Sequence, residues 1–146
     1  MILEPALDQD APRLLAGAVG QLAASLHTEL VNSGYSLMPE DVLLCVVQAV
    51  CKYAAWDTLD AQRNATGSVS VDSRLVLAAH EWQIIEPLVR AHCDLIQANR
   101  MEASRSLGME QVGMSVSEAM QGLQMQQDLL AQRAFCAPPF AIEIDP

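Results

Sequence analysis

Aromatic side chains are scarce in this chain: they make up 4% of its 146 residues, although hydrophobic residues as a whole make up 51%. A core with so few aromatic rings must be filled by leucine, valine, alanine and methionine, which is typical of packed helices. The composition therefore predicts an all-α protein. At this length we expect one domain with a real core, together with extensions.

Basic residues are also few, since 8 lysines and arginines stand against 18 aspartates and glutamates and give a formal net charge of -10. Such a charge repels nucleic acid backbones and anionic membrane surfaces unless the cations are clustered. Arg90, Arg100 and Arg105 come closest to a cluster, but acidic residues are interleaved with them. We therefore do not expect duplex binding as the main function, while an acidic protein can still line a passage for DNA.

The chain has no CxxC pair among its four cysteines, which are Cys45, Cys51, Cys93 and Cys136. Each lies within or beside apolar sequence, so we expect small buried hydrophobes in a reducing cytoplasm, with a buried disulfide as the less favoured alternative.

Signals for secretion or membrane insertion are missing as well. The N-terminus lacks a basic stretch followed by a long apolar one, so we expect no secretion signal. The longest apolar run, residues 42–56, contains Gln48 and Lys52 and is shorter than the roughly 20 residues that a spanning helix needs. We expect a soluble cytoplasmic protein.

Metal-binding motifs fail on spacing. His80-Glu81 begins like the zinc motif HExxH, but Ile84 stands where the second histidine must lie one helical turn later. The helical pattern of a carboxylate three residues before a histidine is missing too, because Leu77 precedes His80 and Val89 precedes His92. These spacings predict no metal and no cofactor.

Catalytic motifs are equally absent, since the chain has no GxSxG, no phosphate-binding glycine loop and no nucleotide fingerprint. Cys93 follows His92 directly, but neighbours on a helix point about 100° apart and form no dyad. Glu81 and Glu86 are acids on a long helix, which a solvated face explains. We expect a protein that is not an enzyme.

Periodicity predicts a bundle of about four helices at residues 1–133 and an extended C-terminal arm at residues 134–146. The first helix is expected from Asp10 to Asn32, with Leu15, Val19, Leu22, Leu26 and Leu30 on one stripe. The second begins at Met38-Pro39, and its almost uniformly apolar body predicts a central helix buried on every side. Residues 60–71 are expected to form a loop, with a short strand at 68–71 as an option.

The third predicted helix is long, from residue 72 or 73 to about 106, and is kinked at Pro87. It carries two apolar stripes. The first is Leu75, Ala79, Trp82, Ile85, Val89, Cys93 and Ile96, and the second is Leu77, Ile84, Leu88 and Leu95. Two apolar faces need two partners: one is the protein's own bundle, and the other is a second layer of helix or an adjacent subunit.

The fourth predicted helix begins at the capping-box sequence Ser115-Val116-Ser117-Glu118 and runs to about Arg133. Its expected stripe is Val116, Met120, Leu123 and Leu130. The five methionines from Met101 to Met125 fit either an adaptable binding surface or core filling, and we favour core filling. Trp56 and Trp82 are likewise expected to anchor the core.

The C-terminal sequence AFCAPPFAIEIDP is an unusual end for a helical chain. Phe140, Ile142 and Ile144 alternate with other residues as in a half-buried strand, and Pro138 and Pro139 stiffen the segment. Such a tail either folds back on its own bundle or pairs with another molecule. Because no other confident strand is predicted, we favour a partner-binding role.

Residues 72–146 resemble the head-to-tail connector proteins of tailed bacteriophages, also called adaptor or head-completion proteins. The likeness lies in Glu81-Trp82, Ile85-Glu86-Pro87-Leu88, Glu102-Ala103-Ser104-Arg105-Ser106-Leu107-Gly108, Val116-Ser117-Glu118-Ala119 and the stretch from Ala134-Phe135 to Ile144. The resemblance implies a small helical bundle that assembles as a ring, typically twelve-fold, beneath the portal in the neck of the virion.

What the resemblance implies for individual residues follows from that arrangement. In that family the C-terminal extension reaches onto the portal or a neighbouring subunit, so Phe140, Ile142 and Ile144 become anchors, with the stiff Pro138 and Pro139 before them. The stripe of Leu77, Ile84, Leu88 and Leu95 becomes the candidate ring interface. The expected partners are the portal protein, further copies of the chain, tail or neck proteins, and DNA that passes through the lumen without specific binding.

The expected function is therefore that of a structural virion protein, assembled in the host cytoplasm, which extends the DNA channel between portal and tail. One alternative is a small acidic cytosolic binding module or chaperone that acts as a monomer or dimer. Another is an enzyme whose site assembles only in the folded chain, for which a pocket with converging polar groups would be the sign.

Overall fold

The computed structural model describes residues 14–106 and 114–136. Their elements, in chain order, are β1 (Gly17–Ala18), α1 (Val19–Asn32), α2 (Pro39–Ala54), α3 (Asp60–Arg63), β2 (Val76–Leu77), α4 (Ala79–Ser106) and α5 (Val116–Cys136). Helices dominate, and the only described strands form a two-residue ladder. The expected all-α class is confirmed.

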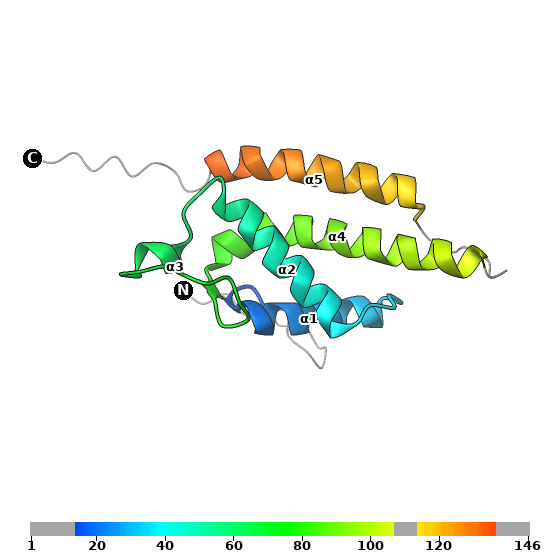
Figure 1. Cartoon of the computed structure of the whole chain (residues 1–146), viewed down its shortest axis with the longest axis horizontal. Helices are drawn as coiled ribbons and strands as arrows, with labels where there is room; N and C mark the ends of the chain where they lie inside the picture. The colour runs from blue at the N-terminus through cyan, green and yellow to red at the C-terminus, as the bar shows by residue number, and fades with distance from the viewer. Residues whose placement is uncertain (1–13, 107–113, 137–146) are drawn as a thin grey trace, which may run out of the picture.

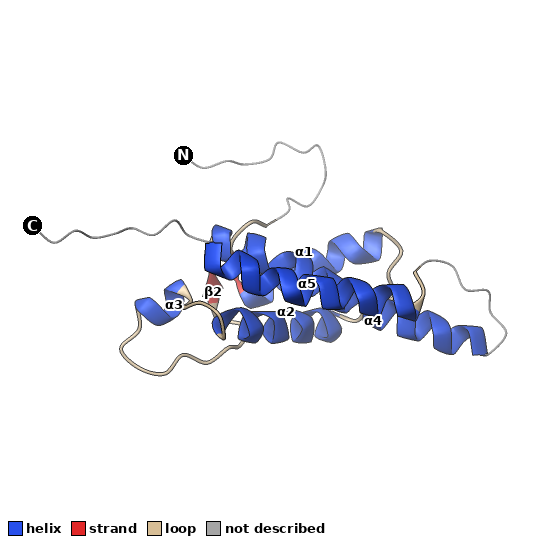
Figure 2. Cartoon of the chain, turned by 90° about the horizontal axis from the view of Figure 1, so that it is seen from above, coloured by secondary structure: helices blue, strands red, loops and turns tan. Residues whose placement is uncertain are grey.

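Helix α4 forms the middle layer of the bundle. Helix α5 returns antiparallel along one side of it, α1 lies on the side away from α5, and α2 crosses obliquely and packs on both α1 and α4 (Figure 1). In the view from above, α1 and α2 lie on opposite sides of α5, and α3 and its loop project at one end (Figure 2). The expected second partner of the long helix is thus supplied by the same chain.

The core consists of apolar side chains, most of them aliphatic, spaced one turn apart on three helices. Nine of them, all at most 4% exposed, are Leu22, Leu26 and Leu30 of α1, Val42, Val46 and Val50 of α2, and Trp82, Ile85 and Val89 of α4. Burying one such side chain contributes roughly 1.5–3 kcal/mol. Leu44 of α2 is 55% exposed, so the expectation that this helix is buried on every side is wrong.

Helix α1 begins later than its apolar spacing predicts, at Val19 instead of Asp10. Residues 14–18 are not helical, and Leu15 is 46% exposed instead of lying on the stripe. The backbone N–H groups of Val19 and Gly20 donate to Leu75 O and Ser73 O, each at 2.8 Å. A segment distant in sequence therefore satisfies the first donors of the helix, which the local pattern cannot reveal.

Residue 20 must be small, because a Cβ atom there would lie 3.1 Å from both the Cβ and the backbone O of Ser73. The other end of α1 stops where expected, at the Asn32-Ser33-Gly34 sequence. Gly34 has a φ of +97° and accepts a conformation that ends helices and that other residues rarely adopt.

The long helix begins at Ala79, so the expected start at residue 72 or 73 is wrong. Leu75 and Leu77 are buried, but they reach the core from a turn and from β2, which pairs antiparallel with β1 through Gly17 and Leu77. The predicted loop at 60–71 begins with the short helix α3, and its optional strand at 68–71 does not form. Pro87 lies inside α4, as expected.

Helix α5 begins at the predicted position, and the N–H of Glu118 donates to Ser115 Oγ at 3.2 Å. Its buried side chains are those of Ala119, Leu130 and Ala134. The predicted stripe is thus right for Leu130 but wrong for Met120, which is 58% exposed. Alanine at a buried position lets α5 approach α4 closely, a signal that a search for large apolar residues misses.

Candidate interaction surface

The four residues expected to line a ring interface do not share a free face. Leu77 and Leu88 are each 1% exposed and belong to the core of the chain itself. Ile84 and Leu95 are partly buried, and Ile84 packs against that core. The expectation that these four residues form one outer contact surface is therefore wrong. Leu77 lies in β2 and not on the helix, and α4 is covered by α2 and α5.

Large apolar side chains are exposed on helix α5 and just before it. Met114 is 46% exposed, Met120 58% and Met125 56%. The expectation that the methionines fill the core is wrong for these three. Methionine is flexible and polarizable, and exposed methionines are typical of surfaces that adapt to a partner.

A second exposed apolar position lies on a different helix. Leu44 of α2 is 55% exposed, and Val31 at the end of α1 is 44% exposed. Trp56, which was expected in the core, is 50% exposed, whereas Trp82 is buried as predicted. Apolar surface is therefore offered by both the α2 and the α5 sides of the bundle.

The loop between α1 and α2 is tied to α4 by polar contacts spaced one turn apart. Tyr35 OH donates to Asp94 Oδ1 at 2.5 Å, and Ser36 N donates to Gln97 Oε1 at 2.8 Å. Arg100 then donates to Ser36 O at 2.9 Å and to Asp41 Oδ2 at 2.7 Å. We call these contacts the polar seam. They hold the loop and the start of α2 in fixed register against α4.

Two shallow hollows flank the polar seam and share Asp94 and Met114 in their linings. The carboxylate of Asp94 accepts the hydroxyl of Tyr35 and so serves the fold. The hollows are therefore interpreted as depressions in the surface beside the exposed Met114. Among the described residues, no set of catalytic groups converges in them.

The two glutamates considered for acid-base chemistry are buried, which contradicts the expected solvated face. Glu86 is 8% exposed and pairs with Arg90, whose Nη2 lies 2.8 Å from Glu86 Oε1 and 2.9 Å from Glu29 Oε2. This bridge connects α4 to α1. A carboxylate paired in this way contributes to the fold and offers no free base.

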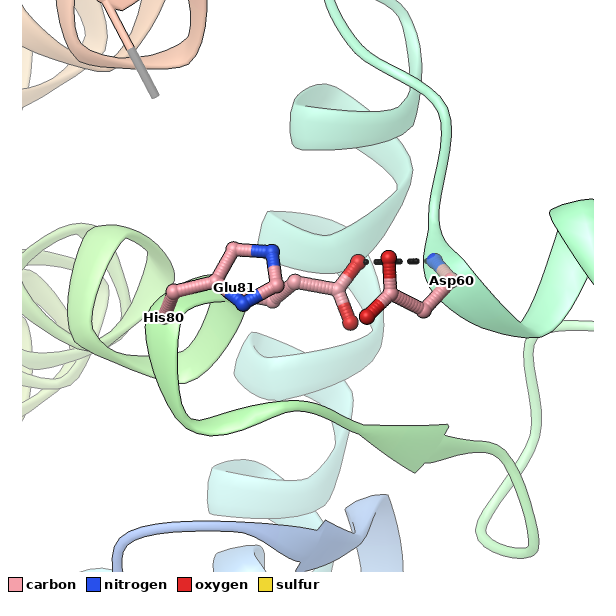
Figure 3. Close-up of side chains that lie close together, drawn as sticks. All are labelled: Asp60, His80 and Glu81. Carbon is pink, nitrogen blue, oxygen red and sulfur yellow. Dashed lines mark hydrogen bonds between the residues drawn. The ribbon is translucent and has the colours of Figure 1, made fainter. Parts of the chain in front are cut away.

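Glu81 is fully buried and caps two helices at once. Its Oε1 accepts the backbone N–H of Ala78 at 2.9 Å, and its Oε2 accepts that of Asp60 at 3.1 Å. The first bond serves the start of α4, and the second, drawn in Figure 3, serves the start of α3. The sequence does not reveal this capping role of Glu81, because its second bonded partner lies 21 residues earlier.

The described cysteines divide by burial. Cys45 and Cys93 are buried, as expected. Cys51 is exposed, so the expectation that it is buried is wrong. A hydrogen bond to Cys45 and burial raise the pKa of the Cys93 thiol, and the same bond lowers that of Cys45. All three thiols are free, so the two buried ones behave as small hydrophobes.

The predicted partner-binding residues of the tail, Pro138, Pro139, Phe140, Ile142 and Ile144, lie outside the described residues. Among the residues that are described, no helix is both long and apolar enough to cross a membrane. No family model matches the chain, and neither a curated protein nor a solved structure matches it.

Proposed function

We propose that the chain is a structural protein of a tailed bacteriophage that forms a ring between the portal and the tail in the virion neck. The resemblance of residues 72–146 to head-to-tail connector proteins supports this function. A helical bundle that presents residues of this segment on its surface is compatible with such a role, and the ring extends the DNA channel.

The observation that carries the proposal is the exposed apolar surface on two different helices. Leu44 lies on α2, whereas Met120 and Met125 lie on α5, and each is more than half exposed. A subunit of a closed ring contacts its neighbours head to tail and needs two unlike surfaces.

The acidic charge suits a channel through which DNA moves. A net charge of -10 repels phosphate groups, so DNA slides past without sticking to the ring. The ring therefore guides DNA without binding a sequence, and this agrees with the absence of a cationic cluster from the sequence.

Substitutions on the two apolar surfaces test the proposal. Met120→Glu with Met125→Glu changes the α5 surface, and Leu44→Glu changes the α2 surface; both add charge where a neighbour would pack. Gln21→Glu is the control, because Gln21 is exposed on α1 and the change adds the same charge outside both surfaces. Each protein is mixed with a portal ring and its assembly mass is measured by sedimentation, with circular dichroism to verify folding.

We expect the unaltered chain and the Gln21→Glu control to form rings on the portal, and the two surface variants to stay monomeric while folded. Rings of unchanged mass from both folded surface variants would contradict the proposed contacts. The exposed methionines also suit the alternative, a small acidic binding module. A monomer or dimer indifferent to the portal would favour that module.

A further inference from the structure

Three potential metal ligands converge at the end of the bundle where α3 meets α4. Asp60 is the first residue of α3, and His80 and Glu81 lie in the first turn of α4. One ligand atom from each residue can be chosen so that all three lie within 4.8 Å of one another. Figure 3 shows the side chains of the three residues close together, with the carboxylates of Asp60 and Glu81 facing each other.

Glu81 is the fixed member of this group. Its side chain is 0% exposed, and each carboxylate oxygen accepts one backbone N–H, from Ala78 and from Asp60. A carboxylate has about four acceptor positions, so each oxygen retains a lone pair for another partner. Backbone donors that hold a carboxylate in one orientation are the kind of support that metal ligands receive in proteins.

The other two ligands are open to solvent and adjustable. Asp60 is partly buried and His80 is exposed, so water and ions reach both. The nearest cation to Asp60 is Arg63, whose Nη1 lies 3.6 Å from Oδ1 with both side chains at least 40% exposed. An exposed pair of this kind is worth only about 0–1 kcal/mol and yields readily to a stronger partner.

Electrostatics also favours a cation at this point. The buried carboxylate of Glu81 lies beside the carboxylate of Asp60, and like charges at such a distance repel each other. Exposed carboxylate pairs can tolerate that repulsion in water, but Glu81 has no contact with solvent. A divalent ion between the two groups removes the repulsion, and the imidazole of His80 supplies a third ligand.

We propose that Asp60, His80 and Glu81 bind a divalent transition-metal ion of the Zn²⁺ type, with water completing its coordination. A mixed nitrogen and oxygen set suits zinc, whereas Mg²⁺ and Ca²⁺ prefer oxygen alone. Ligand bonds of about 2.0–2.2 Å place ligand atoms closer together than 4.8 Å, so His80 and Asp60 rotate inward as the ion binds. The ion joins α3 and its loop to α4.

The helical zinc motifs do not reveal this site, because its ligands do not all lie on one helix. The spacing HExxH requires a second histidine at position 84, where the chain has isoleucine. The third ligand comes instead from Asp60, which α3 brings back to the first turn of α4.

Calorimetric titration of the full chain with Zn²⁺ after chelator treatment tests the site, and parallel titrations use Mn²⁺ and Mg²⁺. The variants are His80→Ala and Asp60→Asn; both keep Glu81 and its two backbone bonds, so the fold is retained. Asp128→Asn is the matched control, because Asp128 is an exposed acid on α5, remote in sequence from the cluster. Thermal unfolding with and without Zn²⁺ is the second readout.

We expect Zn²⁺ to bind more tightly than Mg²⁺ and to raise the unfolding temperature. His80→Ala and Asp60→Asn should each weaken Zn²⁺ binding by about tenfold or more, with no effect of Asp128→Asn. Absence of Zn²⁺ binding, or binding that is the same in all three variants, would overturn the proposal. The test is independent of ring assembly, because it needs neither a portal nor a second subunit.

Discussion

Tyr35 and Asp94 join the loop after α1 to the middle of α4, because the phenol hydroxyl donates a hydrogen bond to Asp94 Oδ1. The bond, burial and the carboxylate charge together raise the pKa of Tyr35 to about 12 from 10.0. The folded protein thus favours the neutral phenol over the phenolate more strongly than the unfolded chain does. It is the first contact of the polar seam and fixes the position of the loop.

Alkaline unfolding should reveal this bond. Since the folded pKa lies above the unfolded one, its stabilising effect is complete below pH 10 and is lost as pH rises through 12. Tyr35→Phe should lower the free energy of unfolding at pH 8 by about 1 kcal/mol. Between pH 10 and 12 the free energy of unfolding should fall less steeply in the variant than in the unaltered protein. Urea unfolding at a series of pH values measures this fall. An unchanged decline would contradict this assignment.

Removal of Arg90 should destabilise the fold far more than removal of an exposed arginine. Arg90→Met leaves Glu86, which is 8% exposed, without its guanidinium partner, and it removes the ion pair with Glu29 that joins α1 to α4. We expect a loss of about 2–3 kcal/mol, somewhat below the cost for a fully buried pair. Arg74→Met is the control, since Arg74 is 89% exposed in its pair with Asp72 and should cost under about 1 kcal/mol. If chemical unfolding showed the same loss of free energy of unfolding for Arg90→Met and Arg74→Met, the stabilising role of the Arg90 bridge would be refuted.

Two glycines in helices should respond differently to alanine. At Gly122 of α5 a new Cβ meets nothing within 4 Å, so Gly122→Ala should stabilise the protein by about 0.5–1 kcal/mol. At Gly20 the new Cβ would lie 3.1 Å from the backbone O of Ser73, and this close contact reduces the stabilisation that alanine otherwise gives a helix. Thermal unfolding should rank Gly122→Ala clearly above Gly20→Ala. The reverse order would show that the contact between α1 and the segment before β2 is looser than described.

Thiol reactivity should separate the described cysteines. In a Cys136→Ser background, Cys51 should react with a disulfide reagent in the native protein because it is exposed. Cys45 and Cys93 are 2% and 0% exposed and should react only when the chain unfolds. The count of fast and slow thiols, with and without denaturant, measures this difference. Three fast thiols in the native protein would contradict the packing of α2 against α4.

Local signals predicted much of this fold. Pro39 with the acids after it begins α2, Gly34 ends α1, and Ser115 caps α5, and each of these depends on residues within one turn. The failures share another cause. Leu75 and Leu77 extend the apolar spacing of α4 backwards, yet their backbone pairs with the segment around residues 17–20, which no local pattern contains.

The candidate sites were harder to predict for the same reason. Met120 has the spacing of a core residue, but Ala119 occupies the contact with α4 because a small side chain lets two helices approach. A solvated face is the expectation for Glu81, but the nearby backbone N–H of Ala78 and the distant one of Asp60 hold its carboxylate in the core. Burial decided by tertiary partners cannot be read from periodicity alone.

The mass of the protein mixed with a portal ring, measured for the full chain and for a chain ending at Ala137, tests the connector function most directly. We expect the full chain to add a ring of subunits to the portal and the shortened chain not to, because the removed segment contains Phe140, Ile142 and Ile144. A monomer or dimer that ignores the portal in both forms would contradict the connector function.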